Sequence, residues 1–341
     1  MSAPLAQRLR TSRTARIRRD ALVCALLALL ALALFAVSLV WGNSVTPIGE
    51  VLRVLAGEPV PGASFVVGEL RLPRALGGLL AGLAFGLGGT LFQTMLRNVL
   101  ASPDVIGISA GASASAIIAI GLFGASGIVV SGVAVLGALA AALLVWACAY
   151  RRGLSGIRFV LVGIAVAAAL QAVISYVLTR SDVRAAQEAV VWMTGSLSRS
   201  LWDQLGPTAP VLLVLIALGL FAAARLQTLR LGDDTAAALG VRVQAARLGV
   251  ILCGVLLIAV ATSLTGPIAF VAFLAGPIAL RLVRRAEAVP VAAALVGALL
   301  VLGGDLIAQH LTPAVLPVGV VTGLLGAPVL LILLMRGRTR V

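Results

Sequence analysis

Stretches of about twenty apolar residues recur along this chain, and they restrict its fold more than any other feature of the sequence. Such a stretch is long enough to cross a bilayer as an α-helix. Charged residues make up only 11% of the 341 residues, and they gather between the stretches. A soluble domain carries about 25% charged residues. The mean hydropathy is +1.14. We therefore predict an all-α, polytopic membrane protein.

The layout of the stretches predicts about ten transmembrane helices in a single transmembrane domain over residues 21–335. This domain lies between an Arg-rich N-terminal tail at 1–20 and a short tail at 336–341. The start resembles a signal peptide, but its apolar part is too long, so we predict an uncleaved first span. The segment at 268–282 is short and contains Gly276 and Pro277, which is typical of a broken crossing surrounded by protein. The spans are predicted at 21–41, 75–95, 105–124, 127–149, 157–179, 208–224, 244–264, 268–282, 289–308 and 316–335.

Arginine is unevenly distributed between the alternate loops of this layout. Twenty of the 26 arginines fall in the two tails and in the loops on the same side as the tails. The six arginines on the other side are balanced by six acidic residues. Because short positive loops stay in the cytoplasm, we predict that both termini are cytoplasmic and that the chain lies in the plasma or inner membrane.

The sequence excludes several classes of function. All 26 basic residues are arginine, so the chain lacks the lysine of a Walker A loop and cannot hydrolyse ATP by that route. Its arginines are dispersed and its aromatic residues are few, which argues against nucleic-acid binding. The cysteines Cys24, Cys148 and Cys253 lie far apart in apolar runs, a spacing that indicates no metal site.

The loop at 226–247 is the most unusual segment on the cytoplasmic side. Asp233 or Asp234 can cap a short helix, Ala236 to Leu239 can continue it, and Gly240 can end it. A short helix with a small apolar ridge suits docking to a partner protein. A merely solvated loop is the alternative interpretation.

Glycines at 78, 82 and 86 follow one another at four-residue intervals in the second span. This spacing places them on one helix face, where the missing side chains let another helix approach closely. We predict that this face serves helix packing alone.

Six segments, in the same order along the chain, resemble FecCD-type permeases, the iron-siderophore and vitamin B12 branch of ABC importers. They cover nearly all of the chain after about residue 40. The segments are ELRLPRALGGLLAG at 69–82, RNVLASPDVIGISAGAS at 97–113, WMTGSL at 192–197, LGDDTAAALGV at 231–241, GPIAFVAF at 266–273 and LPVGVVTGLLGAPVLLILL at 316–334. The resemblance implies the fold of a type II ABC importer permease.

The chain departs from the family pattern at a few positions. Val99 stands where proline is usual, Gly276 and Pro277 stand where many members have Pro-His, and Gln309 stands where an arginine commonly follows the acid of the penultimate span. These changes leave the predicted fold intact. The change at Gln309 removes one basic contact from the outer face.

The resemblance implies roles for particular residues. Arg71 and Arg74 of the RLPR segment would face glutamates of an extracytoplasmic substrate-binding protein, or would act only as interfacial anchors. Asn98 with Leu100, and Ser155 with Gly156, match positions near the inner gate. The segment that would dock in a groove of the ATPase comprises Leu231, Gly232, Asp233, Asp234, Thr235, Ala238, Leu239, Gly240 and Val241.

Two polar residues in spans suggest other hypotheses. Asp305 lies in the ninth predicted span, where an acid is either functional or part of a helix break or interface. Ser109 lies in GISAG, the pattern of a nucleophile elbow, but the chain's one histidine, His310, is predicted at the opposite membrane face. An intramembrane hydrolase therefore lacks its base.

The sequence thus predicts a transport subunit that is not an enzyme. It would pair with a second permease subunit, identical or related, with two ATPase subunits that use ATP and Mg, and with a substrate-binding protein. This chain itself would bind no cofactor. A ferric siderophore is the expected substrate, and cobalamin and haem are alternatives within the family. An ion-coupled secondary transporter is the alternative from another class, but it needs polar groups near the midplane.

Overall fold

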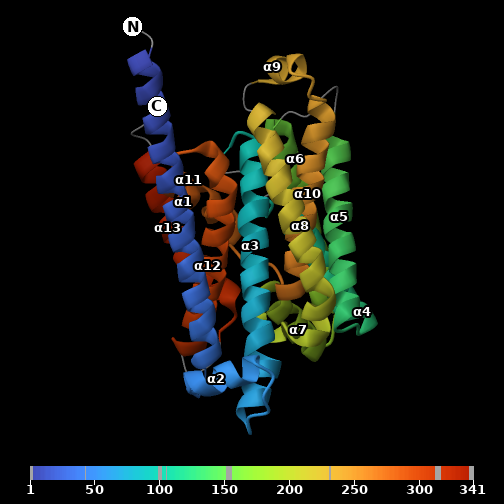
Figure 1. Cartoon of the computed structure of the whole chain (residues 1–341). Helices are drawn as coiled ribbons and strands as arrows, with labels where there is room; N and C mark the ends of the chain where they lie inside the picture. Colours follow the sequence, from blue (N-terminus) through green and yellow to red (C-terminus); the bar gives the residue numbers. More distant parts are fainter. Residues whose placement is uncertain are drawn as a thin grey trace.

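The computed structural model describes residues 3–42, 44–98, 102–104, 106–150, 156–229, 232–311 and 316–337. Over these residues the chain is helical, and the one β-type contact is an isolated bridge between Trp41 and Val45. The helices run roughly parallel to one long axis (Figure 1). They are α1 Ala3–Val40, α2 Ile48–Leu55, α3 Leu72–Met95, α4 Ile108–Phe123, α5 Ile128–Ala149, α6 Gly156–Arg180, α7 Val183–Met193, α8 Trp202–Leu229, α9 Asp233–Ala238, α10 Val243–Thr265, α11 Val271–Leu282, α12 Val289–His310 and α13 Val318–Gly337.

Each of the ten predicted spans corresponds to one of these helices. Within the described residues, seven helical segments are long and apolar enough to cross a membrane, and three shorter apolar helices accompany them. Helix α11 is one of the short ones, as its glycines and prolines predict, and it follows a turn in which Phe270 has a φ of 65°. The helices beyond the predicted ten are α2, α7 and α9, which lie at the ends of the bundle (Figure 1).

Helix α1 is continuous from Ala3 to Val40, so the predicted boundary at residue 20 falls inside it. The carboxylate of Asp20 is buried there and accepts hydrogen bonds from the backbone amides of Arg284 (3.0 Å) and Arg285 (2.9 Å). These bonds attach α1 to the segment between α11 and the short 3-10 helix η3, Ala286–Ala288.

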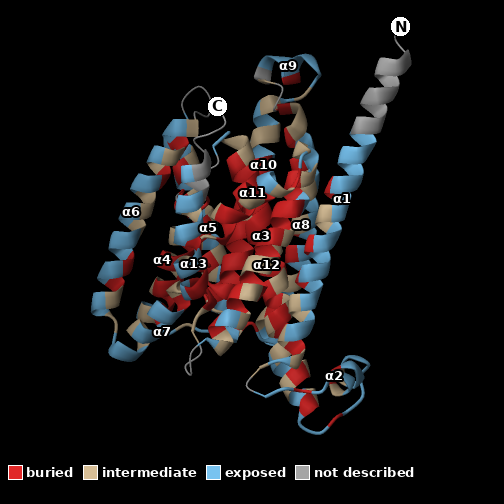
Figure 2. Ribbon diagram, turned by 90° about the vertical axis from the view of Figure 1, so that its left-hand side faces the viewer, coloured by how far each residue is buried: buried red, intermediate tan, exposed pale blue. Residues whose placement is uncertain are grey.

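Helix α3 forms the centre of the fold. It packs against α8, α10, α11 and α12, and 83% of its most apolar window is buried, against 17% for α1 and α6. Figure 2 shows this buried centre with α1 and α6 exposed on either side. A π-helix, η1 Ser64–Arg71, leads directly into α3 and gives it an unbroken start.

The glycine face of α3 explains its close fit to α12. A Cβ on Gly86 would overlap the carbonyl oxygen of Ala293, and one on Gly82 would lie 2.6 Å from the Cα of Ala298. The predicted packing role of these glycines is therefore confirmed. Gly78 lies against the side chain of Leu197 and against that of Leu302, which is also in α12.

Both chain ends and α9 lie at one end of the bundle, and α2 and α7 lie at the other (Figure 1). We call the end with α9 the inner end and the end with α2 the outer end. The inner end corresponds to the arginine-rich side of the predicted topology.

Candidate functional site

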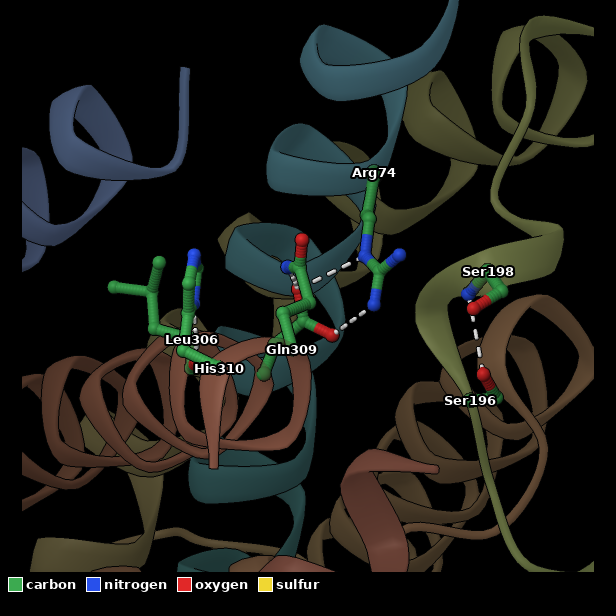
Figure 3. A network of polar contacts seen from close by, with 7 residues as sticks. Arg74, Ser196, Ser198, Leu306, Gln309 and His310 are labelled. Atoms are coloured by element: carbon green, nitrogen blue, oxygen red, sulfur yellow. Dashed lines mark hydrogen bonds and ion pairs between the residues drawn. The ribbon is translucent and has the colours of Figure 1, made fainter. Parts of the chain in front are cut away.

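An ion pair at the outer end joins two of the residues singled out by sequence. The guanidinium of Arg74, in the first turn of α3, donates Nη2–H and Nε–H to the two carboxylate oxygens of Asp305 in α12, at 2.8 and 3.0 Å. The amide of Gln309 donates to the same carboxylate at 2.8 Å. Figure 3 shows Arg74 and Gln309 converging on this point. The side chain of Asp305 is only 5% exposed. Its carboxylate is satisfied within the chain because it accepts the hydrogen bonds from Arg74 and Gln309.

Arg71 holds the turn that follows α1. Its Nη1–H group donates to the carbonyls of Leu39 (2.9 Å) and Val40 (3.0 Å) and to the hydroxyl of Thr46 (3.2 Å). Its Nη2–H group donates to the carbonyl and the hydroxyl of Ser44, at 2.6 and 3.3 Å. One side chain thus fixes the segment that links α1 to α2.

His310 closes the same outer surface. Its ring lies against that of Trp41, with centroids 4.4 Å apart and the planes tilted by 41°, and its Nδ1 lies 2.8 Å from the carbonyl oxygen of Leu306. Ser109 is in the first turn of α4, on the opposite side of the bundle, and donates to the carboxylate of Asp104 at 2.5 Å. The serine therefore has an acid beside it and lies far from the histidine that a hydrolase would need.

The loop between α8 and α10 contains the predicted short helix, α9, which stands clear of the bundle at the inner end (Figure 1). The predicted cap is wrong, because the N-cap residue is Gly232, with a φ of 103°. Glycine is favoured there because a left-handed φ costs it little. Gly240 ends the helix as predicted, since its amide bonds Ala237 O and the amide of Val241 bonds Ala236 O.

Burial divides the predicted coupling segment into an anchored and an exposed part. Ala236 is fully buried and belongs to the main core, whereas Leu239 is 63% exposed. Gly232 and Val241 are half-buried. Leu231 and the side chain of Asp233 lie outside the described part of the chain. The exposed members of the segment are Asp234, Thr235, Ala238, Leu239 and Gly240.

Two of the four predicted gate residues can be placed. Asn98 follows α3 at the inner end and is exposed, and its amide bonds Gln93 O at 3.1 Å. Gly156 begins α6, and a Cβ added to it would lie 3.6 Å from the carbonyl oxygen of Leu96. Both therefore lie beside the inner end of α3. Leu100 and Ser155 lie outside the described residues.

Sequence reasoning did not single out Arg97 or Asp20. Arg97 has a φ of 49°, in the left-handed region, and donates to Leu229 O at 3.1 Å. Asp20 is an acid at the start of a long apolar run, and this position could have been used to predict that its carboxylate has a partner within the chain. Arg97 gives no such signal, because an arginine in a cytoplasmic loop is what the charge rule predicts.

The loop between α3 and α4 contains an acid that is held differently from Asp305. Asp104 is partly buried and contacts the hydroxyls of Ser109 and Ser102. Burial raises the pKa of the Asp104 carboxyl, and the two serine hydrogen bonds oppose that shift.

A family model for the FecCD transport family matches residues 29–336, which is nearly the whole chain. The chain belongs to the FecCD transport family. FecCD membership agrees with the resemblance carried by the six sequence segments, and the multi-pass architecture is that of an ABC permease.

Individual FecCD relatives match over most of their length. The ferric enterobactin transport system permease protein FepG of Escherichia coli (strain K12) is 41% identical over 288 residues, which cover 84% of this chain and 87% of FepG. The achromobactin transport system permease protein CbrC of Dickeya dadantii (strain 3937) is 37% identical and covers 91% and 90% of the two chains. The iron(3+)-hydroxamate import system permease protein FhuG of Bacillus subtilis (strain 168) is 33% identical, covering 92% and 97%.

The fold also matches that of a solved structure. A structure described as an inward-facing conformation of a metal-chelate type ABC transporter superposes with a TM-score of 0.81 at 26% identity. The match covers 92% of this chain and 99% of that one. The type II importer permease fold predicted from the sequence is therefore confirmed.

Proposed function

We propose that this FecCD permease moves ferric siderophore complexes across the cytoplasmic membrane, driven by ATP that separate subunits hydrolyse. The observation that carries the proposal is the similarity, over most of the chain, to FepG and FhuG, whose names specify transport of ferric enterobactin and of iron(3+)-hydroxamate. Membership of the FecCD transport family and the match of the helical bundle to an ABC transporter support the permease role.

The inner end supports docking of an ATPase at residues 231–241. Helix α9 projects from the bundle, and Leu239 offers an exposed apolar side chain beside the exposed Asp234 and Thr235. The side chain of Ala236 is buried and anchors α9 to the core by packing. A movement of α9 caused by closure of the ATPase would therefore be transmitted to α8 and α10, which the loop connects. We place both termini and α9 in the cytoplasm.

The outer end supports docking of a substrate-binding protein around Arg71 and Arg74. Because both guanidiniums are bonded within the chain, they would contribute mainly by holding the shape of the surface that the binding protein meets. A second permease subunit, identical or related, would complete the translocation path. The apolar side chains exposed on α6, such as Leu161 and Tyr176, are available to face that subunit or lipid.

The bonding of Asp305 argues against an ion-coupled secondary transporter. A proton or sodium carrier needs an ionisable group in a broken helix near the midplane that can exchange its ion. Asp305 instead lies near the outer end of α12 in a two-point salt bridge to Arg74.

The test is uptake of radiolabelled ferric siderophores into cells that lack the gene, with the wild-type or a variant chain restored. Deletion should abolish uptake of at least one ferric siderophore. The double substitution Asp233→Arg and Asp234→Arg should also abolish it while the protein stays in the membrane. Asp203→Arg is the matched control, since Asp203 is an exposed acid at the start of α8, at the other end of the bundle.

Labelled cobalamin and haem serve as the competing substrates. If deletion abolished uptake of one of these and left every ferric siderophore unchanged, the substrate assignment would be wrong and the permease role would stand. Normal uptake by the double Asp variant would contradict the proposed coupling segment.

A further inference from the structure

A cavity of about 300 Å³ lies beside the inner end of α3. Its walls come from α3, α8, α11 and the junction of η3 with α12. This volume is at the lower limit of about 300 Å³ for cavities that hold small ligands. We propose that the cavity binds a small oxyanion, a phosphate or carboxylate group, supplied either by a free anion or by a lipid headgroup.

An unsatisfied hydroxyl lines the cavity. Thr90 is 2% exposed, and its Oγ1 has no hydrogen-bond partner among the described residues. A buried hydroxyl without a partner costs about 1–3 kcal/mol, so a polar guest that accepts its hydrogen would be favoured. Gln93 and Gln227 line the same space, and their side-chain amide nitrogens donate to the carbonyls of Phe273 (2.9 Å) and Ala286 (3.3 Å).

The charge of the lining favours an anion. Arg97 lines the cavity, and a smaller neighbouring cavity that shares Arg97 is also lined by Arg247. The described lining of both cavities contains no acidic residue. The bond from Arg97 to Leu229 O orients the guanidinium and uses one of its five N–H donors.

A helix N-terminus adds to this charge. Val289 and Pro290, the first two residues of α12, line the cavity, and the N-cap residue Ala288 makes no side-chain cap bond. The N-terminal end of a helix carries a partial positive charge of about half a unit. An oxyanion in the cavity would meet this end of α12 together with Arg97 and Thr90.

The backbone at Arg97 also points to a role for its side chain. The amide of Arg97 bonds Thr94 O and the amide of Asn98 bonds Gln93 O, so α3 ends in a Schellman motif. The left-handed position of that motif is usually glycine, because a residue with a Cβ pays about 1–2 kcal/mol there. Arginine occupies this position in spite of that cost, which indicates that its side chain contributes something that glycine cannot.

Thermal unfolding of the purified, delipidated full chain in detergent tests the proposal, with inorganic phosphate titrated against chloride at constant ionic strength. Saturating phosphate should raise Tm by about 2 °C, as expected for a ligand present at tens of times its Kd. A parallel series uses nanodiscs of phosphatidylcholine with and without phosphatidylglycerol. A shift with phosphate in detergent identifies a free-anion site, and a shift with phosphatidylglycerol alone identifies a headgroup site.

Three variants connect either shift to the cavity. Arg97→Gln and Thr90→Val should each weaken anion binding about 10-fold or more. Arg97→Gly removes the charge while suiting the left-handed backbone, so it tests binding even if the other arginine variant folds poorly. The matched control is Arg225→Gln, because Arg225 is exposed near the same end of α8, over the ring of Phe221 and outside the cavity lining.

Two results would overturn the proposal. The first is the absence of any shift with phosphate and with phosphatidylglycerol. The second is a shift that survives in the Arg97 and Thr90 variants and disappears in Arg225→Gln, which would identify a surface effect of charge. The site stands independently of the proposed substrate, because the unfolding assay needs neither uptake nor partner subunits.

Discussion

The two ends of α3 are built on opposite principles. At the outer end, Arg71 and Arg74 are bonded to acceptors of the same chain, and the bridge to Asp305 ties α3 to α12. At the inner end, Arg97 stands in a strained backbone position beside a cavity that contains an unsatisfied hydroxyl. The two outer arginines are thus bonded within the chain, whereas the inner arginine borders a cavity. This difference suits a helix whose outer end is a fixed surface and whose inner end responds to something that binds.

The largest effect is expected at the middle of α3, which joins the two ends. Gly86→Val would place side-chain atoms on the backbone of α12 and should cost more than about 4 kcal/mol, enough to prevent recovery of folded protein. Gly132→Val in α5 is the control, because a Cβ at Gly132 meets nothing within 4 Å. Yield of monodisperse protein in detergent is the measurement. Equal yields from both variants would mean that α3 and α12 are not packed as described.

Removal of the acid at the outer end is expected to have the next largest effect. Asp305→Leu leaves the Arg74 charge unpaired in a largely buried setting and should lower the free energy of unfolding by about 3 kcal/mol. The double variant Arg74→Met with Asp305→Leu should recover most of this loss. Denaturation of the single and double variants gives the coupling energy. Additive losses would show that the outer end is not held by this bridge.

A smaller effect is expected from substitutions of Arg97 at the inner end, which measure the backbone strain at that residue. Arg97→Gly and Arg97→Ala both lose the bond to Leu229 O, but only alanine keeps a Cβ at a φ of 49°. The glycine variant should therefore unfold at a higher denaturant concentration, with an advantage of about 1 kcal/mol. A more stable alanine variant would place Arg97 in an ordinary backbone conformation and remove the contrast between the ends.

The smallest effect is a change in pH dependence caused by Asp104, in the loop that follows the inner end of α3. Burial raises the pKa of Asp104 above its usual 3.8, so the folded chain binds this proton more tightly than the unfolded chain does. Stability should therefore fall as the pH rises from about the unfolded pKa through the raised folded pKa. Asp104→Asn should flatten that part of the profile, as measured by unfolding between acidic and neutral pH. An unchanged slope would contradict the assignment to Asp104.

The sequence predicted the helices well because crossing a bilayer requires long apolar stretches, and these are visible without any knowledge of packing. All ten spans have a helix at the predicted place. The short α11 was predicted from its glycines and prolines, and the end of α9 from Gly240. The N-cap of α9 was wrong because acidic residues are favoured caps in general, whereas here a left-handed glycine precedes them.

The polar contacts between helices were much harder to predict. Arg74 and Asp305 were each noticed, but their pairing depends on which helices are neighbours, and 231 residues separate them in the chain. The same holds for the bonds of Asp20 to the amides of Arg284 and Arg285. The cavity at Arg97 has no local signal, because four separate helical segments form its walls.

The glycine face of α3 has a consequence for how the protein is made. Its span has the lowest hydropathy of the seven long spans and the largest buried share, so it gains least from lipid and most from protein neighbours. Its close partner α12 begins about 200 residues later, and a ribosome adds about 5–20 residues per second, which gives a delay of about 10–40 s. During that interval the glycine face must wait uncovered in the membrane, or be shielded by an insertion chaperone, until the last helices arrive.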